Sequence, residues 1–111
     1  MEKILIVDDE RGLREVLSIM LKRAGYAVTE ASDGEEAIGH INKEMFDLVI
    51  TDLRMPKADG MAVLKAVKSS FPETVVLVIT AFATADSAVD AMKQGAYDYL
   101  TAEEWLLHDW S

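Results

Sequence analysis

The feature that most constrains this sequence is a strict alternation of short apolar runs with stretches of helical period. Five runs rich in strand-forming residues predict strands, at 4–7, 26–31, 47–52, 74–79 and 97–101. Between them, apolar residues recur at three- and four-residue intervals, as in amphipathic helices. Gly25, Pro72 and Gly95 end three of these stretches. Strands that alternate with helices form right-handed βαβ units, so the pattern predicts an α/β domain with a doubly wound parallel sheet.

The helical period is clearest in the first stretch, where six apolar residues form one stripe. The stripe comprises Leu13, Val16, Leu17, Met20, Leu21 and Ala24. The other three stretches carry shorter sets: Ala37, Ile38 and Ile41, then Met61, Leu64 and Val67, then Ala85, Ala88, Val89 and Met92. Such stripes are the faces by which helices pack against a core.

The number of strands narrows the architecture further. A chain of 111 residues has room for one domain. Five strands in this alternation favour the flavodoxin-like order 2-1-3-4-5. In such sheets the ligand lies beyond the carboxyl ends of the strands, where the strand order reverses, which here falls between the first and third strands. The first run is followed directly by Asp8, and the third run ends in Asp52.

Three aspartates are therefore expected to meet at one end of the sheet: Asp8, Asp9 and Asp52. Three carboxylates in a small space repel one another unless a cation or a proton compensates their charge. An all-oxygen ligand set favours a hard cation, Mg²⁺ or Mn²⁺. One aspartate can then attack a phosphoryl group, and the Thr80 hydroxyl, at the end of the fourth strand, can reach a phosphoryl oxygen. The alternative is that these side chains only cap the helices that follow.

Composition excludes several classes of function. The chain has 20 acidic and 11 basic residues, a net charge of −9, which disfavours direct binding to nucleic acid or an anionic membrane. The absence of cysteine excludes disulfides, a thiolate zinc site and a cysteine nucleophile. No apolar run approaches the ~20 residues that span a bilayer, and the N-terminus does not have the pattern of a signal peptide.

Two related functions are also disfavoured by the residues at the strand ends. A flavin phosphate after the first strand would be repelled by the acidic sequence Asp8-Asp9-Glu10. A phosphatase with an aspartyl nucleophile needs a second aspartate two residues later, where this chain has Arg54. His40 and His108 are the only histidines, and both are expected at the surface.

Several motifs together resemble the response-regulator receiver domain of two-component signalling. They are VDDE at 7–10, TDLRMP at 51–56, DG at 59–60, TAF at 80–82 and GAYDYL at 95–100. The resemblance covers residues 2–101 and is greatest to receivers of the nitrogen-regulatory type, which precede an ATPase that acts on sigma-54 polymerase. It implies a cytoplasmic bacterial protein that accepts a phosphoryl group from a sensor histidine kinase and switches an output. Such a protein is not an enzyme, apart from its own phosphotransfer and dephosphorylation, and its effector domain is absent from this chain.

The resemblance also implies roles for individual residues at the acidic end. Asp52 would be the phospho-acceptor. Mg²⁺ would be held by Asp52, by the backbone carbonyl of Arg54 and by the aspartates after the first strand. Of these, Asp9 matches the direct ligand and Asp8 the water-mediated one.

The switch residues follow from the same resemblance. Thr80 would be the switch hydroxyl, and Tyr99 the aromatic side chain that rotates inward when Thr80 moves. Arg54 and Phe82 match the variable positions that tune hydrolysis of the acyl phosphate.

One departure from the family pattern bears on activity. The family places a lysine three residues after the switch aromatic, where this chain has Ala102, and the last basic residue is Lys93. The missing ammonium group removes a charge-assisted hydrogen bond to the phosphoryl oxygens, of about 1.5–3 kcal/mol. The alternative function is therefore a degenerate or truncated receiver that acts only as a protein-binding module.

The C-terminal tail also departs from the family. Residues 1–101 are expected to form the receiver domain, and residues 102–111 an atypical tail in place of the loop and fifth helix. Large apolar residues in the tail predict that it packs as a truncated or replacement helix: Trp105, Leu106, Leu107 and Trp110. A short helix leaves part of the sheet face uncovered, which predicts a homodimer through this region. A monomer whose tail folds back on its own chain is the alternative.

Overall fold

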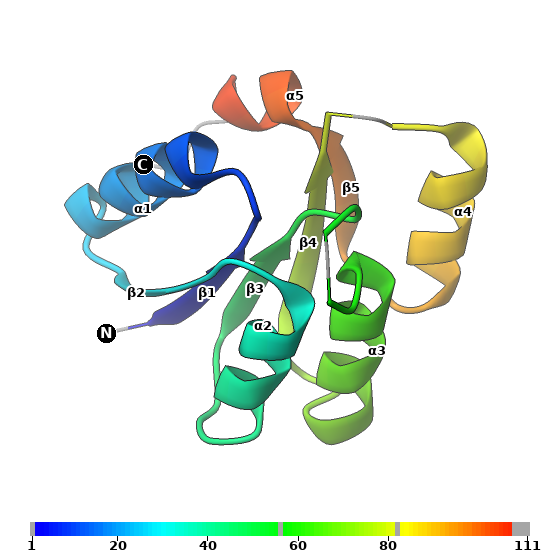
Figure 1. The fold of residues 1–111 in the computed structure, drawn as a ribbon, viewed down its shortest axis with the longest axis horizontal. Helices are drawn as coiled ribbons and strands as arrows, with labels where there is room; N and C mark the ends of the chain where they lie inside the picture. Colours follow the sequence, from blue (N-terminus) through cyan, green and yellow to red (C-terminus); the bar gives the residue numbers. More distant parts are fainter. Residues whose placement is uncertain (1, 56, 82, 108–111) are drawn as a thin grey trace.

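Five parallel strands form a single sheet in the order β2-β1-β3-β4-β5 (Figure 1). The structure is a computed structural model that describes residues 2–55, 57–81 and 83–107. The strands are β1 (Lys3–Val7), β2 (Ala27–Ala31), β3 (Leu48–Thr51), β4 (Val75–Thr80) and β5 (Asp98–Thr101). The helices are α1 (Arg11–Arg23), α2 (Gly34–Ile41), α3 (Gly60–Ser70), α4 (Ala85–Lys93) and α5 (Ala102–Leu106). The predicted fold class and strand order are confirmed.

The helix ends follow from local sequence. The carboxylate of Asp33 accepts a hydrogen bond from the Glu36 amide at the start of α2, and Asp59 caps α3 in the same way. Gly25 and Gly95 follow α1 and α4 with φ values of 99° and 102°, a left-handed conformation that glycine adopts without strain.

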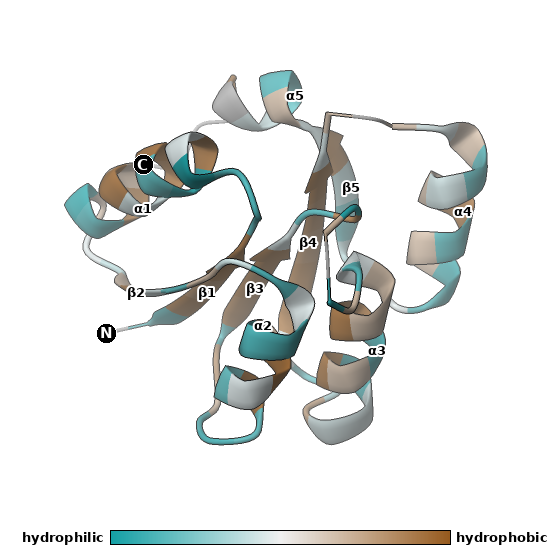
Figure 2. Cartoon of the chain, viewed as in Figure 1, coloured by the Kyte–Doolittle hydropathy of each residue, from teal (hydrophilic) through white to brown (hydrophobic). Residues whose placement is uncertain are grey.

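The three central strands, β1, β3 and β4, are apolar on both faces, because helices cover the sheet on each side, and Figure 2 shows them mostly in brown. The edge strands β2 and β5 are more polar. In β1, Leu5 and Val7 point into one core and Ile4 and Ile6 into the other. The first core lies under α2, α3 and α4. The second lies under α1 and α5. A strand with a core on each face needs apolar residues at successive positions, which is why the central strands are continuous apolar runs.

The described part of the C-terminal tail packs against the sheet. The short helix α5 begins directly after β5 with a capping box between Thr101 and Glu104. Trp105 is fully buried in the second core. The expectation that the tail packs is confirmed for Trp105, whereas Leu107 is 81% exposed, and His108 and Trp110 lie outside the described residues.

The predicted stripe of α1 is only partly buried, which corrects the sequence analysis. Leu17 and Leu21 are buried, but Val16 and Met20 are 47% and 36% exposed. Leu13, Leu17 and Leu21 pack against the second core, and the only other helix on this face is the five-residue α5 among the described residues. The apolar stripe of α1 is therefore wider than the surface that covers it. On α4 the apolar residues Val89 and Met92 are likewise exposed, and the small Ala91 is buried instead.

Among the described residues, no helix combines the length and the apolar character that crossing a bilayer requires.

Candidate functional site

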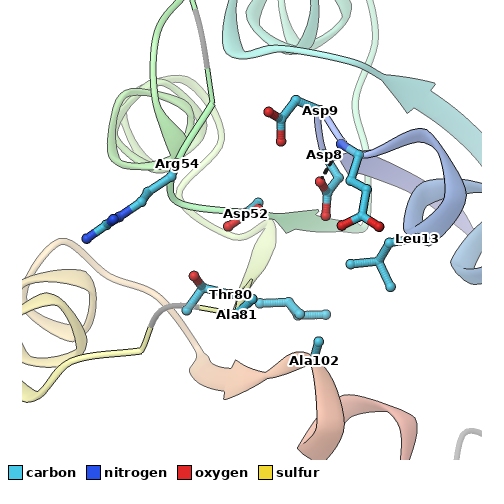
Figure 3. Close-up of a pocket in the computed structure, with 10 residues that line it drawn as sticks. Asp8, Asp9, Leu13, Asp52, Arg54, Thr80, Ala81 and Ala102 are labelled. Carbon is cyan, nitrogen blue, oxygen red and sulfur yellow. Dashed lines mark hydrogen bonds between the residues drawn. The ribbon is translucent and has the colours of Figure 1, made fainter.

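The carboxyl ends of β1 and β3 bring three aspartates together, as predicted (Figure 3). Asp8 and Asp9 follow β1, and Asp52 follows β3. One carboxylate oxygen from each lies within 4.8 Å of the others. Asp8 is buried, Asp52 half-buried and Asp9 exposed. The cluster is therefore open to solvent on the Asp9 side and closed behind Asp8.

Backbone hydrogen bonds fix the two inner aspartates. The Asp52 amide donates to the Val7 carbonyl at 2.9 Å, and this bond joins the ends of β1 and β3. The Asp52 carboxylate accepts from the Leu53 amide at 2.6 Å, and the Asp8 carboxylate accepts from the Glu10 amide at 2.9 Å. Both side chains are thus oriented by the chain that immediately follows them.

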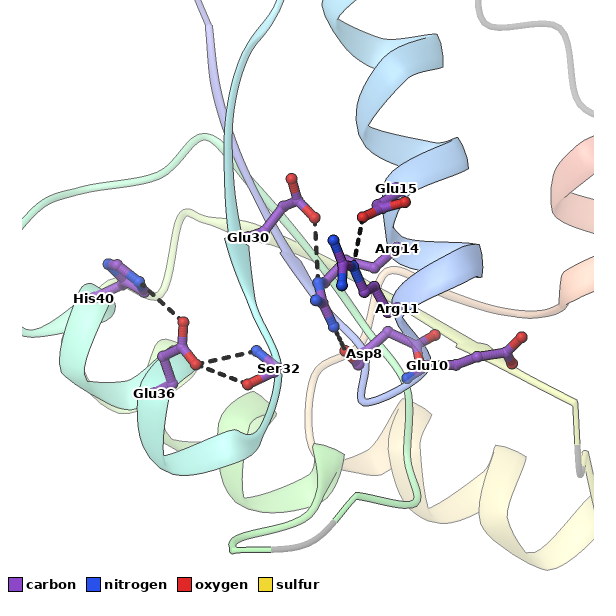
Figure 4. Close-up of polar contacts among 9 residues, drawn as sticks. All are labelled: Asp8, Glu10, Arg11, Arg14, Glu15, Glu30, Ser32, Glu36 and His40. Carbon is purple, nitrogen blue, oxygen red and sulfur yellow. Dashed lines mark hydrogen bonds and ion pairs between the residues drawn. The ribbon is translucent and has the colours of Figure 1, made fainter.

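Arg14 supports the same end of β1 from α1, a role that the sequence analysis missed. Its Nη1 donates to the Asp8 carbonyl at 2.7 Å, and its Nε pairs with Glu30 on β2 at 3.2 Å (Figure 4). The sequence does show a basic residue, Arg14, about one turn into the helix that follows Asp8 and Asp9. It could not be separated from an ordinary solvent-exposed charge without the register of β2.

The electrostatics of the cluster favour a cation. The pKa of Asp8 is raised from 3.8 to about 6, chiefly because the carboxyl group is buried. The hydrogen bond from the Glu10 amide opposes this rise, and the charges of Asp52, Asp9 and Glu10 contribute to it. Burial also raises the pKa of Asp52, as does the charge of Asp9. Hydrogen bonds to Asp52 from the amides of Leu53 and Arg54 and from Thr80 lower it. Each negative charge is therefore costly unless a positive charge balances it.

A cleft of about 230 Å³ opens above the cluster. Its lining residues are Asp8, Asp9, Glu10, Leu13, Asp52, Arg54, Ile79, Thr80, Ala81 and Ala102. One side of the cleft is acidic, and the facing side is apolar. Of these ten residues, Arg54 alone is basic, and Figure 3 shows its side chain directed away from the aspartates. The donor set fits a hard divalent cation, because carboxylate oxygens are the ligands that Mg²⁺ prefers.

The structure brings Thr80 to the cluster but places Tyr99 elsewhere. Thr80 is buried at the end of β4, and its hydroxyl bonds to Asp52. Tyr99 does not line the cleft. It is half-buried on β5, and its hydroxyl is hydrogen-bonded to Ser87 in the capping box of α4. Phe82, a predicted tuning position, lies outside the described residues.

The loop after Asp52 approaches its own strand closely at Gly60. The Gly60 amide donates to the Leu53 carbonyl at 2.9 Å. A Cβ at Gly60 would lie 2.0 Å from the Asp52 carbonyl oxygen, so no other residue fits there without a shift. The glycine of the DG motif therefore lets α3 begin directly against the acidic site.

Comparison with known proteins agrees with this geometry. Residues 4–104 match the family described as the response regulator receiver domain. The chain is 41% identical to transcriptional regulatory protein ZraR of Escherichia coli (strain K12) over 97 residues, covering 87% of this chain and 22% of that protein.

Two solved structures are also similar. The structure of a response regulator from Burkholderia pseudomallei with a phosphorylated aspartic acid, a calcium ion and citrate is 30% identical, with a TM-score of 0.87 over 96% of this chain and 65% of that chain. The response regulator TrrA of Thermotoga maritima, in complex with Mg²⁺ and BeF, is 32% identical, with a TM-score of 0.82 over 91% of this chain and 86% of that chain.

This chain belongs to the response-regulator receiver domain family. The predicted resemblance is confirmed, and it agrees with ZraR being a transcriptional regulatory protein. The chain spans about a fifth of the length of ZraR, 22%. Receiver domains of this family are regulatory modules of two-component response regulators.

Proposed function

We propose that Asp52 accepts a phosphoryl group from a sensor histidine kinase, with Mg²⁺ held by Asp8, Asp9, Asp52 and the carbonyl of Arg54. The observation that carries this proposal is the convergence of three carboxylates within 4.8 Å beside the Thr80 hydroxyl. The solved relatives with a phosphorylated aspartic acid and with Mg²⁺ and BeF support the same chemistry.

The residues of the chain have distinct tasks in this reaction. An Asp52 carboxylate oxygen attacks the phosphorus, an oxygen–phosphorus bond forms, and the phosphorus–nitrogen bond to the kinase histidine breaks with return of the electron pair to the imidazole. Bound Mg²⁺ would neutralise the phosphoryl oxygens. The backbone amides of Leu53 and Glu10 keep Asp52 and Asp8 oriented. Ala81, a small residue in the cleft wall, leaves room for the incoming group.

The switch follows from the position of Thr80. Its hydroxyl bonds to the Asp52 carboxylate and, after phosphorylation, would bond to a phosphoryl oxygen instead. That movement would allow Tyr99 to leave Ser87 and rotate inward, and α4 would sense the change through its capping box. The output would lie in an effector domain of a longer protein, such as the sigma-54-dependent ATPase that the resemblance implies.

The alternative is a binding module that no longer signals. Ala102 lines the cleft where the family has a lysine, and the one basic side chain among the lining residues points away. Both features weaken the hold on a phosphoryl group without removing the cation site.

Titration with beryllofluoride and Mg²⁺ separates the two functions. A working receiver binds the phosphoryl mimic saturably, because Asp52 and the cation complete its coordination. Asp52→Asn, which removes the charged ligand at nearly constant volume, is the control and should abolish saturation. If the unchanged chain does not bind beryllofluoride, the result supports the alternative, a binding module that no longer signals.

A homodimer through the C-terminal region is a second proposal for this chain. Four large apolar side chains on α1 and at the end of α5 are exposed: Val16, Ile19, Met20 and Leu107. Helices α1 and α5 cover the same face of the sheet, so these residues belong to one layer. Burying them against a second copy would remove apolar surface from water.

A further inference from the structure

The N-terminus of α2 is seated directly on the loop that follows Asp52. A Cβ built on Gly34 would lie 2.0 Å from the carbonyl oxygen of Ala58 and 2.9 Å from its Cβ. Gly34 is buried, and α2 and α3 lie side by side in Figure 1. The contact involves backbone, which cannot rotate aside as the end of a flexible side chain can. Any residue larger than glycine at this position must therefore displace the loop or the helix.

A hydrogen bond next to Gly34 ties the same two segments together. The amides in the first turn of a helix have no acceptor within the helix. The Glu35 amide, in the first turn of α2, donates to the Lys57 carbonyl at 2.9 Å instead. The helix thus holds two successive carbonyl groups of the loop, one by a hydrogen bond and one by close packing.

The loop segment under α2 has an unfavourable backbone conformation. Lys57 and Ala58 have φ values of 52° and 72°, in the left-handed region that residues with a Cβ rarely adopt. Such conformations persist only where the surroundings enforce them. Contacts on both sides hold Lys57 and Ala58 in this conformation. On one side, Ala58 packs against Gly34 and the Lys57 carbonyl accepts the hydrogen bond from the Glu35 amide. On the other side, Asp59 caps α3.

The same loop carries the groups of the acidic site. Asp52 and Arg54 lie at its start, and Gly60 closes it by donating to the Leu53 carbonyl. The loop is therefore fixed at two points: Gly60 against its own strand, and residues 57–58 against α2. Residues 57–58 lead directly into Asp59 and Gly60, so movement at the second point is transmitted to the first, beside Asp52.

We propose that Gly34 is a positioning residue: by seating α2 on residues 57–58 it sets the path of the loop after Asp52 and so the geometry of the cation site. Gly34 touches neither the cation nor the phosphoryl group. This inference rests on the proposed function in so far as it concerns the cation.

Gly39 supplies a matched control within the same helix. A Cβ at Gly39 would meet nothing within 4 Å. Gly34→Ala and Gly39→Ala therefore make the same chemical change in one helix, and the gain in helix propensity is the larger at Gly39, which is interior. They differ in whether the new methyl group meets the loop.

The first readout is the set of backbone amide chemical shifts without divalent cations. Gly34→Ala should shift the amides of Leu53, Arg54 and Gly60, more than ten residues away in sequence, whereas Gly39→Ala should change only amides of α2. Unchanged shifts in Gly34→Ala at these three positions would overturn the proposal. This readout does not depend on cation binding.

The second readout is Mg²⁺ affinity by calorimetry, at a temperature at which urea unfolding shows each variant to be folded. Gly34→Ala should weaken Mg²⁺ binding roughly 10–100-fold, the usual effect of changing a support behind metal ligands, and Gly39→Ala should leave it unchanged. Equal dissociation constants in Gly34→Ala and the unchanged chain would overturn the proposal. If the unchanged chain itself binds no Mg²⁺, the proposed function fails, and the amide shifts alone decide whether Gly34 positions the loop.

A second variant covers the case in which Gly34→Ala does not fold. Glu35→Pro removes the amide that donates to Lys57, and proline is tolerated in the first turn of a helix. It should produce the same amide shifts at Leu53, Arg54 and Gly60. A folded Glu35→Pro chain with unchanged shifts there would also overturn the proposal.

Discussion

At the scale of single residues, the acidic site combines what the sequence predicts with what only the structure supplies. Asp8, Asp9 and Asp52 were predicted to meet because parallel strands place their carboxyl ends at one edge. Arg14 and Gly34 could not be predicted, because their roles depend on the register of β2 and on a close approach between backbones. The period of apolar residues in the sequence shows which face of a helix or strand is buried. It does not show which atoms approach one another within a few ångströms, as at Arg14 and Gly34.

The raised pKa of Asp8 gives a pH-dependent prediction. Because this pKa rises from 3.8 to about 6 on folding, the folded state binds more protons than the unfolded state in that window, and the free energy of unfolding falls as pH rises through it. Asp8→Asn should therefore stabilise the cation-free protein at pH 7.5 by about 2–3 kcal/mol, with the gain shrinking toward pH 4. Urea unfolding at several pH values measures this.

The control for this experiment is Asp90→Asn, an exposed position on α4. It should change stability by less than about 0.5 kcal/mol at every pH. Asp8→Asn that is no more stable than the unchanged chain at pH 7.5 would contradict the electrostatic account of the cluster.

Ala102 leads to a second residue-scale prediction. It lines the cleft opposite the aspartates, so Ala102→Lys places an ammonium group within reach of a phosphoryl group on Asp52. The variant should raise the extent of phosphorylation by acetyl phosphate, measured by intact mass. An unchanged yield would mean that the missing lysine is not the limiting defect.

At the scale of elements, the sequence predicted every strand to within a residue or two and the four longer helices in order. The central strands β1, β3 and β4 were predictable because a strand buried on both faces is a continuous apolar run. The extent of burial along α1 was not, because it depends on what lies beside the helix. Val16 and Met20 belong to the apolar stripe, yet the five-residue α5 leaves both exposed.

The anchoring of α5 is tested through Trp105. This side chain is fully buried in the core between α1 and the sheet, whereas Leu107 is 81% exposed. Trp105→Ala should lower the free energy of unfolding by about 3–5 kcal/mol, and Leu107→Ala should change it by less than about 0.5 kcal/mol. Urea unfolding of the two variants side by side measures both. If both variants lose less than about 0.5 kcal/mol in the free energy of unfolding, α5 does not contribute to the core.

At the scale of the whole molecule, the distribution of apolar surface suggests association. Light scattering at high micromolar concentration should give a dimer mass, because α1 and the end of α5 expose apolar side chains on one layer. Val16→Lys, which puts a charge on that layer without touching the core, should restore the monomer. A monomer mass for the unchanged chain, also unchanged on deletion of residues 103–111, would end this proposal.

The role of Asp52 as phospho-acceptor is tested by locating the phosphoryl group on the chain. The chain is incubated with acetyl phosphate and Mg²⁺, and tandem mass spectrometry locates the added phosphoryl group. The label is expected on Asp52, which follows the central strand β3 and lies between the aspartates after β1 and Thr80, and no label is expected on Asp52→Asn. A label on Asp8 or Asp9, or equal labelling of Asp52→Asn, would contradict this role of Asp52.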